Sequence, residues 1–241
     1  MTRFGGKDLS DELSNFYEDF YNKTQYTGCM GGFHNYYHRK LEHRHRSNLG
    51  KKLLEIGAGY GEHIKFVKPD FAAYVVSDLH LDPTHPRLKS NLLQVGLNKD
   101  DRIELSKCDV SDLPFEDSTF DRVVITCVLH HVSSLEFALK EIRRVVKDNG
   151  VISIYLPCDP GIVYRLVRHF ASHKKQARII QTSMEHVKFI WSLEHINHYP
   201  GIVSKIHWIF RNDKVMFRGL LSRFIPYDFS IFKIVEIKIQ K

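Results

Sequence analysis

Three glycines at alternate positions, directly after a short apolar run, constrain this chain more than any other feature. Residues 53–63 read Leu-Leu-Glu-Ile-Gly-Ala-Gly-Tyr-Gly-Glu-His. The apolar residues predict a buried strand. Glycine tolerates the dihedral angles of a tight turn and carries no Cβ, so a ligand can approach the backbone closely. The segment therefore predicts a buried strand, a ligand-facing turn and a following helix, the beginning of an α/β fold.

The glycine spacing does not match the dinucleotide-binding pattern G-x-G-x-x-G. Counted from Gly57, the third glycine of that pattern would fall on Glu62. The carboxylate of Glu55, two residues before the first glycine, would also repel a pyrophosphate. The pattern favours a cationic ligand, such as one that carries an ammonium and a sulfonium group.

Acidic residues follow at the ends of the next predicted strands. Residues 72–77 read as a second strand that ends at Asp78, 23 positions after Glu55. This is close to the interval at which an acidic residue meets ribose hydroxyls in nucleoside-binding α/β folds. Residues 103–105 are followed by Asp109, and residues 120–126 form a fourth apolar run. Each acid could also cap a turn, but their order indicates one site at one edge of a sheet.

The E-x-G-x-G-x-G stretch resembles motif I of class I methyltransferases that use S-adenosylmethionine (SAM). The resemblance covers about residues 50–156. It implies an α/β fold with a Rossmann-like, seven-stranded, mostly parallel sheet, a C-terminal antiparallel hairpin, N-terminal helices and a helical lid. It also implies SAM as the cofactor, with the Asp109 carboxylate and the Val110 amide at the adenine. The cofactor-binding residues that it implies are Tyr37, Glu55, Gly57, Ala58, Gly59, Gly61, Asp78, Leu79, Asp109, Val110, Thr126 and Cys127.

The chain divides into four expected parts. Residues 1–49 form an N-terminal helical cap, with one helix after Asp8 and a second around residues 36–41. Residues 50–156 form the SAM-binding core, in which a helix after Ser134 ends at Asn149-Gly150, a helix stop signal. Residues 157–213 form a helical acceptor lid, and residues 214–241 form the closing β-hairpin, because their apolar residues alternate.

The expected lid holds the candidates for proton transfer. Methyl transfer is an in-line displacement that depends mainly on alignment of the nucleophile, and sometimes on removal of its proton. Histidine suits that step because its ordinary pKa lies near 6.5. His195 and His198 stand in a polar and aromatic cluster beside Glu194, and His131 follows the fourth strand. We expect these three histidines to include the base and expect no metal site.

Composition and charge bear on the acceptor. Residues 160–241 carry fourteen Lys or Arg against five Asp or Glu, a net charge of +9. Asn/Asp-Pro-Pro-Tyr, the motif of exocyclic-amine methylases, is absent after the fourth strand, as are paired catalytic cysteines and an aromatic RNA-binding signature. We therefore expect methylation of an oxygen or nitrogen atom in a small polar, anionic acceptor of a natural-product or saccharide type, rather than of a nucleic acid. The 241 residues contain no apolar run of membrane-spanning length, and the four cysteines are dispersed, which favours a reducing cytoplasm.

Three other functions stay open on the sequence. RNA methylation is the first, and a catalytically silent methyltransferase fold that serves as a binding subunit is the second. The third is a nicotinamide reductase, for which Tyr36-x-x-x-Lys40 offers a catalytic pair. In short-chain reductases that pair follows the glycine motif, whereas here it precedes it.

Overall fold

The computed structural model describes residues 3–4, 7–8, 28–45, 47–97, 100–179, 181–218 and 225–241. The helix that the sequence predicts after Asp8 lies outside these residues. Within them, β1 (Arg3–Phe4) and β2 (Lys7–Asp8) form a short antiparallel pair. Every described helix is too short or too polar to cross a lipid bilayer.

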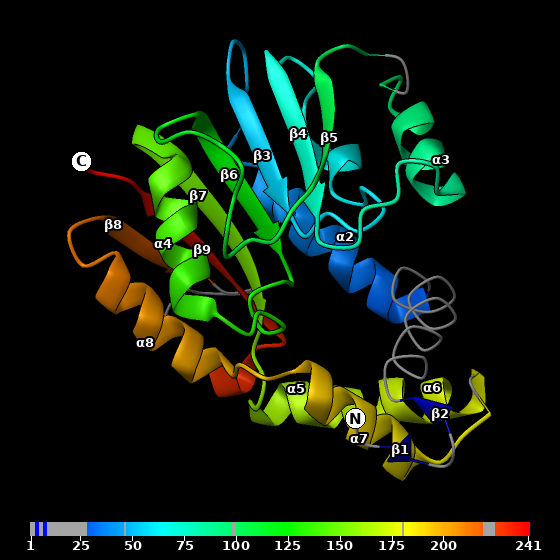
Figure 1. Ribbon diagram of the computed structural model, residues 1–241. Coiled ribbons are helices and arrows are strands. Elements are labelled where there is room, and N and C mark those ends of the chain that lie inside the picture. The colour runs from blue at the N-terminus through cyan, green and yellow to red at the C-terminus, as the bar shows by residue number, and fades with distance from the viewer. Residues whose placement is uncertain are drawn as a thin grey trace.

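A seven-stranded sheet forms the centre of the molecule (Figure 1), in the order β5-β4-β3-β6-β7-β9-β8. Its strands are β3 (Lys52–Ile56), β4 (Ala73–Asp78), β5 (Ile103–Lys107), β6 (Phe120–Thr126), β7 (Val146–Pro157), β8 (Lys214–Arg218) and β9 (Phe232–Lys238). The first five are parallel to one another, while β9 runs antiparallel to both β7 and β8. The predicted sheet with its closing antiparallel hairpin is confirmed.

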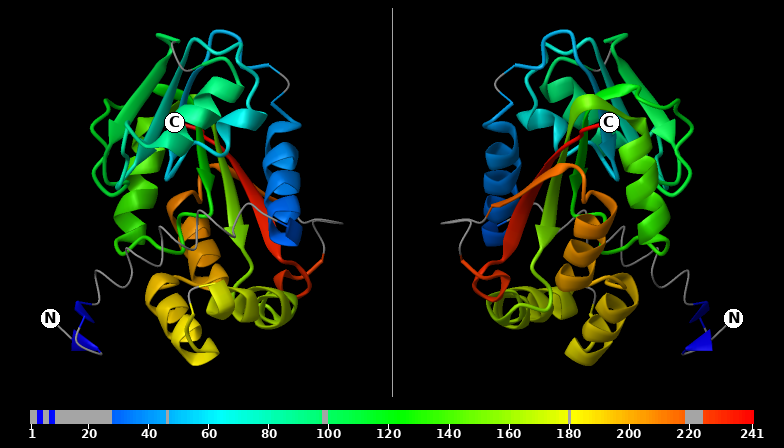
Figure 2. Two further views of the ribbon diagram at one scale, coloured as in Figure 1. Left: turned by 90° about the vertical axis from the view of Figure 1, so that its right-hand side faces the viewer. Right: turned by 90° about the vertical axis from the view of Figure 1, so that its left-hand side faces the viewer.

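Helices cover both faces of the sheet (Figure 2). Helix α2 (Gly28–Glu42) packs on one face, where Tyr37 and Leu41 meet residues of β6 and β7. Helices α4 (Leu135–Val145) and α8 (Tyr199–Ile209) cover the other face, and α3 (Pro86–Gln94) packs near β3 and β4. Because the inner parallel strands are covered on both faces, their sequences are nearly continuous apolar runs.

Short helices gather at the carboxyl end of the parallel strands, in the lower part of Figure 1. They are α5 (Ile162–Val167), a π-helical turn (Arg168–His173), α6 (Lys174–Ile179) and α7 (Met184–Glu194). The expected lid of residues 157–213 is thus not uniform, because Ile202, Ile206 and Phe210 of its last part are fully buried in the main core. Helix α8 belongs to the body of the fold, and α5 to α7 form the layer above the strand ends.

Two local expectations differ from the structure. The helix expected after Gly61 is only a three-residue 3-10 helix, Ile64–Phe66. Helix α4 ends at Val145, four residues before the expected stop at Asn149, because Val146 already pairs with Phe120 of β6. Asn149 has a left-handed φ of 59° and lies within β7, where its amide donates to Ile239. Strand pairing therefore overrides the local stop signal.

Candidate active site

The glycine turn follows the carboxyl end of β3 and is hydrogen-bonded to the carboxyl end of the neighbouring strand, β4. Gly57, Gly59 and Gly61 all have positive φ angles, of 66°, 53° and 70°. The amide of Ala58 donates to the carbonyl oxygen of Ser77 at 2.9 Å, and the amide of Gly59 donates to Asp78 Oδ2 at 2.9 Å. The turn after β3 is therefore held against the last residue of β4, as the sequence predicts.

Two of these glycines meet different surroundings. A Cβ on Gly57 would lie 2.2 Å from Val128 Cγ2, so this residue packs tightly against the loop after β6. A Cβ on Gly59 would meet nothing within 4 Å. The backbone of Gly59 thus faces open space beside the Asp78 carboxylate, an arrangement that fits a bound nucleoside with its ribose at Asp78.

The other expected cofactor residues on the outer strands are accessible. Asp78 is half-buried, and its second oxygen accepts from the His80 amide at 2.8 Å. The Cys108 amide donates to the Asp78 carbonyl, which brings the segment of Asp109 and Val110 beside Asp78. Asp109 is exposed and accepts from the Ser111 amide at 2.7 Å, so it also caps its own turn. Leu79 is 50 % exposed.

Thr126 is the last residue of β6, at the same edge of the sheet, and Cys127 follows it. Cys127 has a left-handed φ of 56°, and its amide donates to the carbonyl oxygen of Tyr155 in β7. Burial raises the pKa of the Cys127 thiol to about 12, so this cysteine stays protonated at neutral pH. It is therefore a poor nucleophile.

Two expected cofactor residues lie in the interior. Tyr37 is fully buried, stacks on Tyr155, and donates its hydroxyl to the carbonyl oxygen of Phe232 at 3.1 Å. Glu55 is 1 % exposed and accepts from the Tyr74 hydroxyl at 2.7 Å. Burial raises the pKa of Glu55 to about 7, so its carboxyl group is no permanent anion for a cationic ligand. The contacts of Tyr37 and Glu55 are therefore with other residues of the protein interior.

A buried polar network fixes the residues that follow the glycine turn. His63 Nε2 lies 3.0 Å from Glu42 Oε1, and Arg122 donates to both Glu42 oxygens at 2.8 and 2.6 Å. All three side chains are at most 7 % exposed. This network ties α2, the glycine segment and β6 together, and no local sequence signal marks it.

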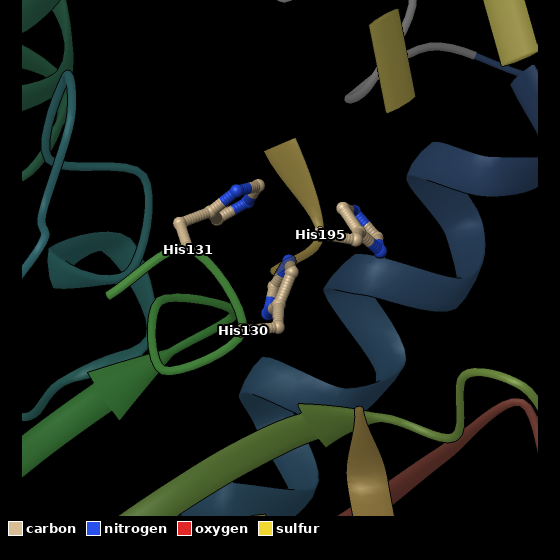
Figure 3. Close-up of side chains that lie close together, drawn as sticks. All are labelled: His130, His131 and His195. Atoms are coloured by element: carbon tan, nitrogen blue, oxygen red, sulfur yellow. The ribbon is translucent and has the colours of Figure 1, made fainter. Parts of the chain in front are cut away.

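Three histidines from two distant segments meet at the carboxyl end of β6 (Figure 3). His130 and His131 follow β6, whereas His195 is the C-terminal cap of α7. One ring nitrogen from each lies within 4.8 Å of the others. Asn197 holds the two segments together, because its side chain donates to the carbonyl oxygens of Leu129 and Val132.

The Nδ1 atoms of His195 and His131 each have a hydrogen-bond partner in the protein. His195 Nδ1 lies 2.9 Å from Asp159 Oδ2, and His131 Nδ1 lies 2.9 Å from the carbonyl oxygen of Glu194. Burial lowers the pKa of His195 to about 4, against the opposing effect of Asp159, and burial also lowers the pKa of His130 well below its usual value. Both rings are therefore neutral at physiological pH.

Of the three predicted catalytic histidines, the structure brings His131 and His195 together. Glu194 Oε2 lies 3.5 Å from His131 Nδ1, and the carboxylate on His195 Nδ1 is that of Asp159. His198 is exposed at the N-terminal cap of α8 and makes no side-chain capping bond. Sequence reasoning missed Asp159, although an acid close to the carboxyl end of a strand, here two residues after β7, follows a rule similar to the one that found Asp78. It also missed Arg168, which lies 3.5 Å from Asp159 and over the ring of Trp191.

Comparison with known proteins agrees with this geometry. Residues 54–154 match the model of a family described as a methyltransferase domain. A demethylmenaquinone methyltransferase from Clavibacter sepedonicus is 32% identical over 108 residues, which cover 44% of this chain and 40% of that protein. Methyltransferase GfsG from Streptomyces halstedii is 26% identical over 162 residues, 66% of this chain and 52% of that protein. The chain thus spans about half the length of these curated relatives.

The fold is also shared with solved structures. The N1-methyltransferase of Burkholderia thailandensis that acts on 1,6-didemethyltoxoflavin, solved with that compound and S-adenosylhomocysteine, superposes with a TM-score of 0.59. The superposition covers 96% of this chain and 87% of the other, at 13% sequence identity. At that identity the likeness concerns the fold alone.

Proposed function

We propose that this chain, whose residues 54–154 match a methyltransferase-domain family, is a class I SAM-dependent methyltransferase that transfers the methyl group of SAM to an oxygen or nitrogen atom of a small polar acceptor. One observation carries the proposal. At the carboxyl edge of the sheet, the open backbone at Gly59 and the Asp78 carboxylate lie on one side of β6, and a histidine cluster follows β6. A cofactor site next to polar acceptor-side groups is the arrangement that methyl transfer requires.

The chain's own residues would divide the work as follows. The turn at residues 57–61 and Asp78 hold the nucleoside part of SAM, with Asp109 and Val110 toward the adenine. SAM supplies a methyl carbon on a sulfonium, so that the C–S electron pair stays on sulfur when the acceptor's lone pair bonds to that carbon. His131 and His195 lie where the acceptor would enter. The third expected base, His198, lies outside this cluster, exposed on the α8 cap.

Proton removal is the step that these histidines could assist. Asp159 fixes the Nδ1 proton of His195, which leaves Nε2 to face the acceptor. With a pKa of about 4, His195 accepts a proton from a neutral acceptor only weakly. Proximity would then supply most of the rate.

An apolar acceptor is a second candidate. Ile162, Leu166 and Phe170 of the α5 region are 45%, 51% and 65% exposed, and Phe189 of α7 is 39% exposed. The Clavibacter relative is named for demethylmenaquinone. A quinone-like ring would pack against such apolar side chains, whereas a phosphorylated or carboxylated acceptor would form ion pairs with the basic residues of the C-terminal third.

A reducing cytoplasm suits either acceptor, and Cys108, Cys127 and Cys158 are free thiols.

Calorimetry with SAM, followed by transfer of a labelled methyl group to a panel of anionic, neutral and quinone acceptors, tests the proposal. We expect SAM to bind and the product mass to increase by one methyl group on a polar acceptor. For the base, the pH–rate profiles of His195→Ala, His131→Ala and His198→Ala are compared with that of the wild-type enzyme. A true base lowers turnover at least about tenfold when removed. Absence of SAM binding in the folded protein would refute the assignment.

A further inference from the structure

We propose that His130, His131 and His195 bind a divalent transition-metal ion, for which Zn²⁺ is the best chemical match. The inference goes beyond methyl transfer and stands without it. It rests on three histidines whose ring nitrogens lie within 4.8 Å of one another (Figure 3). Neutral imidazole is the commonest protein ligand of such ions.

In two of the rings, His131 and His195, the hydrogen bond made by Nδ1 leaves the lone pair on the other nitrogen, Nε2. A carbonyl oxygen only accepts, so His131 Nδ1 must donate to the Glu194 carbonyl, and His131 Nε2 carries the lone pair. The Asp159 carboxylate likewise accepts a hydrogen bond from His195 Nδ1–H, so His195 Nε2 carries the lone pair. Both rings therefore present a nitrogen in the state that a metal ion binds.

Two nitrogens of the cluster also have no protein partner within the described part of the chain. His195 Nε2 and His130 Nδ1 are buried and lack any hydrogen bond there. His130 is 4 % exposed and His195 is 5 % exposed. Buried nitrogen atoms are normally paired. Two unpaired ones that belong to the same cluster indicate a ligand that satisfies both.

The partners of these rings resemble the outer shell of a metal site. A carboxylate that holds the distal nitrogen of a metal-binding histidine fixes its orientation and raises its basicity. Asp159 occupies this position for His195, and the Glu194 carbonyl does so for His131. The guanidinium of Arg168 lies 3.4 Å from His195 Nδ1 and 3.5 Å from Asp159 Oδ2, and it lies over the ring of Trp191. Its charge is thus paired with that of Asp159.

The dimensions suit a zinc ion after a small contraction. Zn–N bonds of about 2.0–2.1 Å in tetrahedral geometry place two nitrogens about 3.4 Å apart. Nitrogens that lie within 4.8 Å of one another would therefore close by at most about 1.4 Å. Three protein ligands leave a fourth position open, the pattern of catalytic rather than structural zinc. That position can take water or an oxygen atom of the acceptor.

Titration of the metal-free full chain with Co²⁺ tests the site without any activity assay. Cobalt replaces zinc in such sites, and its visible absorption is intense only when the ion has few ligands. We expect one Co²⁺ per chain with this absorption, and its displacement by Zn²⁺. His195→Ala and His131→Ala should abolish it, whereas His207→Ala, which removes an exposed histidine of α8, should leave it unchanged. Equal absorption in all four proteins, or none in the wild-type protein, would overturn the proposal.

Two further measurements cover misfolding and the outer shell. In the wild-type protein, Zn²⁺ should protect these three histidines from diethylpyrocarbonate, as mass spectrometry of the modified peptides reports; unprotected histidines contradict the site. Asp159→Asn should weaken Co²⁺ binding about 10–100-fold while the visible spectrum keeps its shape. Calorimetry with SAM on the same samples separates the two proposals, because loss of SAM binding with intact Co²⁺ binding refutes only the methyltransferase activity.

Discussion

At the scale of single residues, Gly57 and Gly59 share a left-handed backbone but face different surroundings. Gly57→Ala adds a Cβ at 2.2 Å from Val128 Cγ2, whereas Gly59→Ala adds one in open space. Each carries a dihedral cost of roughly 1–2 kcal/mol. We expect Gly57→Ala to destabilise the protein more in urea unfolding, and Val128→Ala to restore part of the loss. Gly59→Ala should instead weaken SAM binding more than stability. Equal unfolding midpoints for both variants would contradict this difference.

Asp78 is the residue on which nucleoside binding should depend most. Asp78→Ala removes the carboxylate that we propose accepts hydrogen bonds from two ribose hydroxyls, and it removes the anchor of the Gly59 amide. We expect a loss of about 1.5–3 kcal/mol in SAM binding free energy. Asp109→Ala, at the adenine side, should cost less because one fewer hydrogen bond is involved. The measurement is calorimetric titration of variants whose circular dichroism matches that of the wild-type protein. Unchanged affinity in Asp78→Ala would place the nucleoside elsewhere.

Residues near the strand ends could be predicted because glycine and acid patterns are local. Gly57, Gly59, Gly61, Asp78 and Asp109 all lie at the edge where the sequence predicts them. Glu55 and Tyr37 could not be predicted in the same way. Their burial depends on Tyr74 and Phe232, which come from other elements. A spacing rule carries no information about such partners.

At the scale of elements, helix α2 is attached to the sheet through a buried charge network. Burial alone would raise the pKa of Glu42, but hydrogen bonds from His63 and Arg122 lower it well below its usual range. Glu42→Gln leaves Arg122 buried without its counter-charge, which costs about 3–5 kcal/mol in comparable pairs. We expect that loss in urea unfolding at pH 7. Glu136→Gln, in an exposed pair with Lys205, is the control and should change stability little.

The same helix also makes stability depend on pH through His34. Burial lowers the folded-state pKa of His34 to about 4, so the unfolded chain binds the proton first as the pH falls. Its contribution is complete above about pH 6.5 and is lost below it, by about 2 kcal/mol between pH 7 and pH 5. Compared with His34→Gln, which can still bond the Tyr155 hydroxyl, the wild-type protein should lose that much more stability. A constant difference between the two proteins at both pH values would exclude this role.

The elements of the core were predictable, while those above the strand ends were only partly so. Strand β6 was predicted with its observed bounds, because it contains three consecutive apolar β-branched residues, Val123, Val124 and Ile125. The expected lid was assigned as one unit, since residues 157–213 depart as a whole from the minimal pattern of the family that the chain resembles. Only the packing of Ile202 and Ile206 against the main core distinguishes α8 from α7. The meeting of His195 with His130 likewise depends on Asn197, whose bonds span 65 to 68 positions of the chain.

At the scale of the whole molecule, charge should decide which class of acceptor is recruited. The net charge of +9 over residues 160–241 can attract either a small anion or a polynucleotide. Polynucleotide affinity falls steeply with salt, because each phosphate contact releases counterions. We expect acceptor binding to depend only weakly on salt between 50 and 200 mM, in contrast to the about 10³–10⁵-fold loss of a protein with 6–10 phosphate contacts. A steep slope with tRNA, together with methyl transfer onto it, would favour the RNA methyltransferase alternative.

The place of β9 in the sheet has a consequence for biosynthesis. Strand β9 lies between β7 and β8, although it follows both along the chain. As the ribosome releases the chain from its N-terminus, β7 presents an open edge and β8 has no strand to join. Both remain so until the residues of β9 leave the exit tunnel. Until β9 emerges, the nascent protein therefore exposes the edge of β7 and an unpaired β8 segment, the kind of surface that molecular chaperones shield from aggregation.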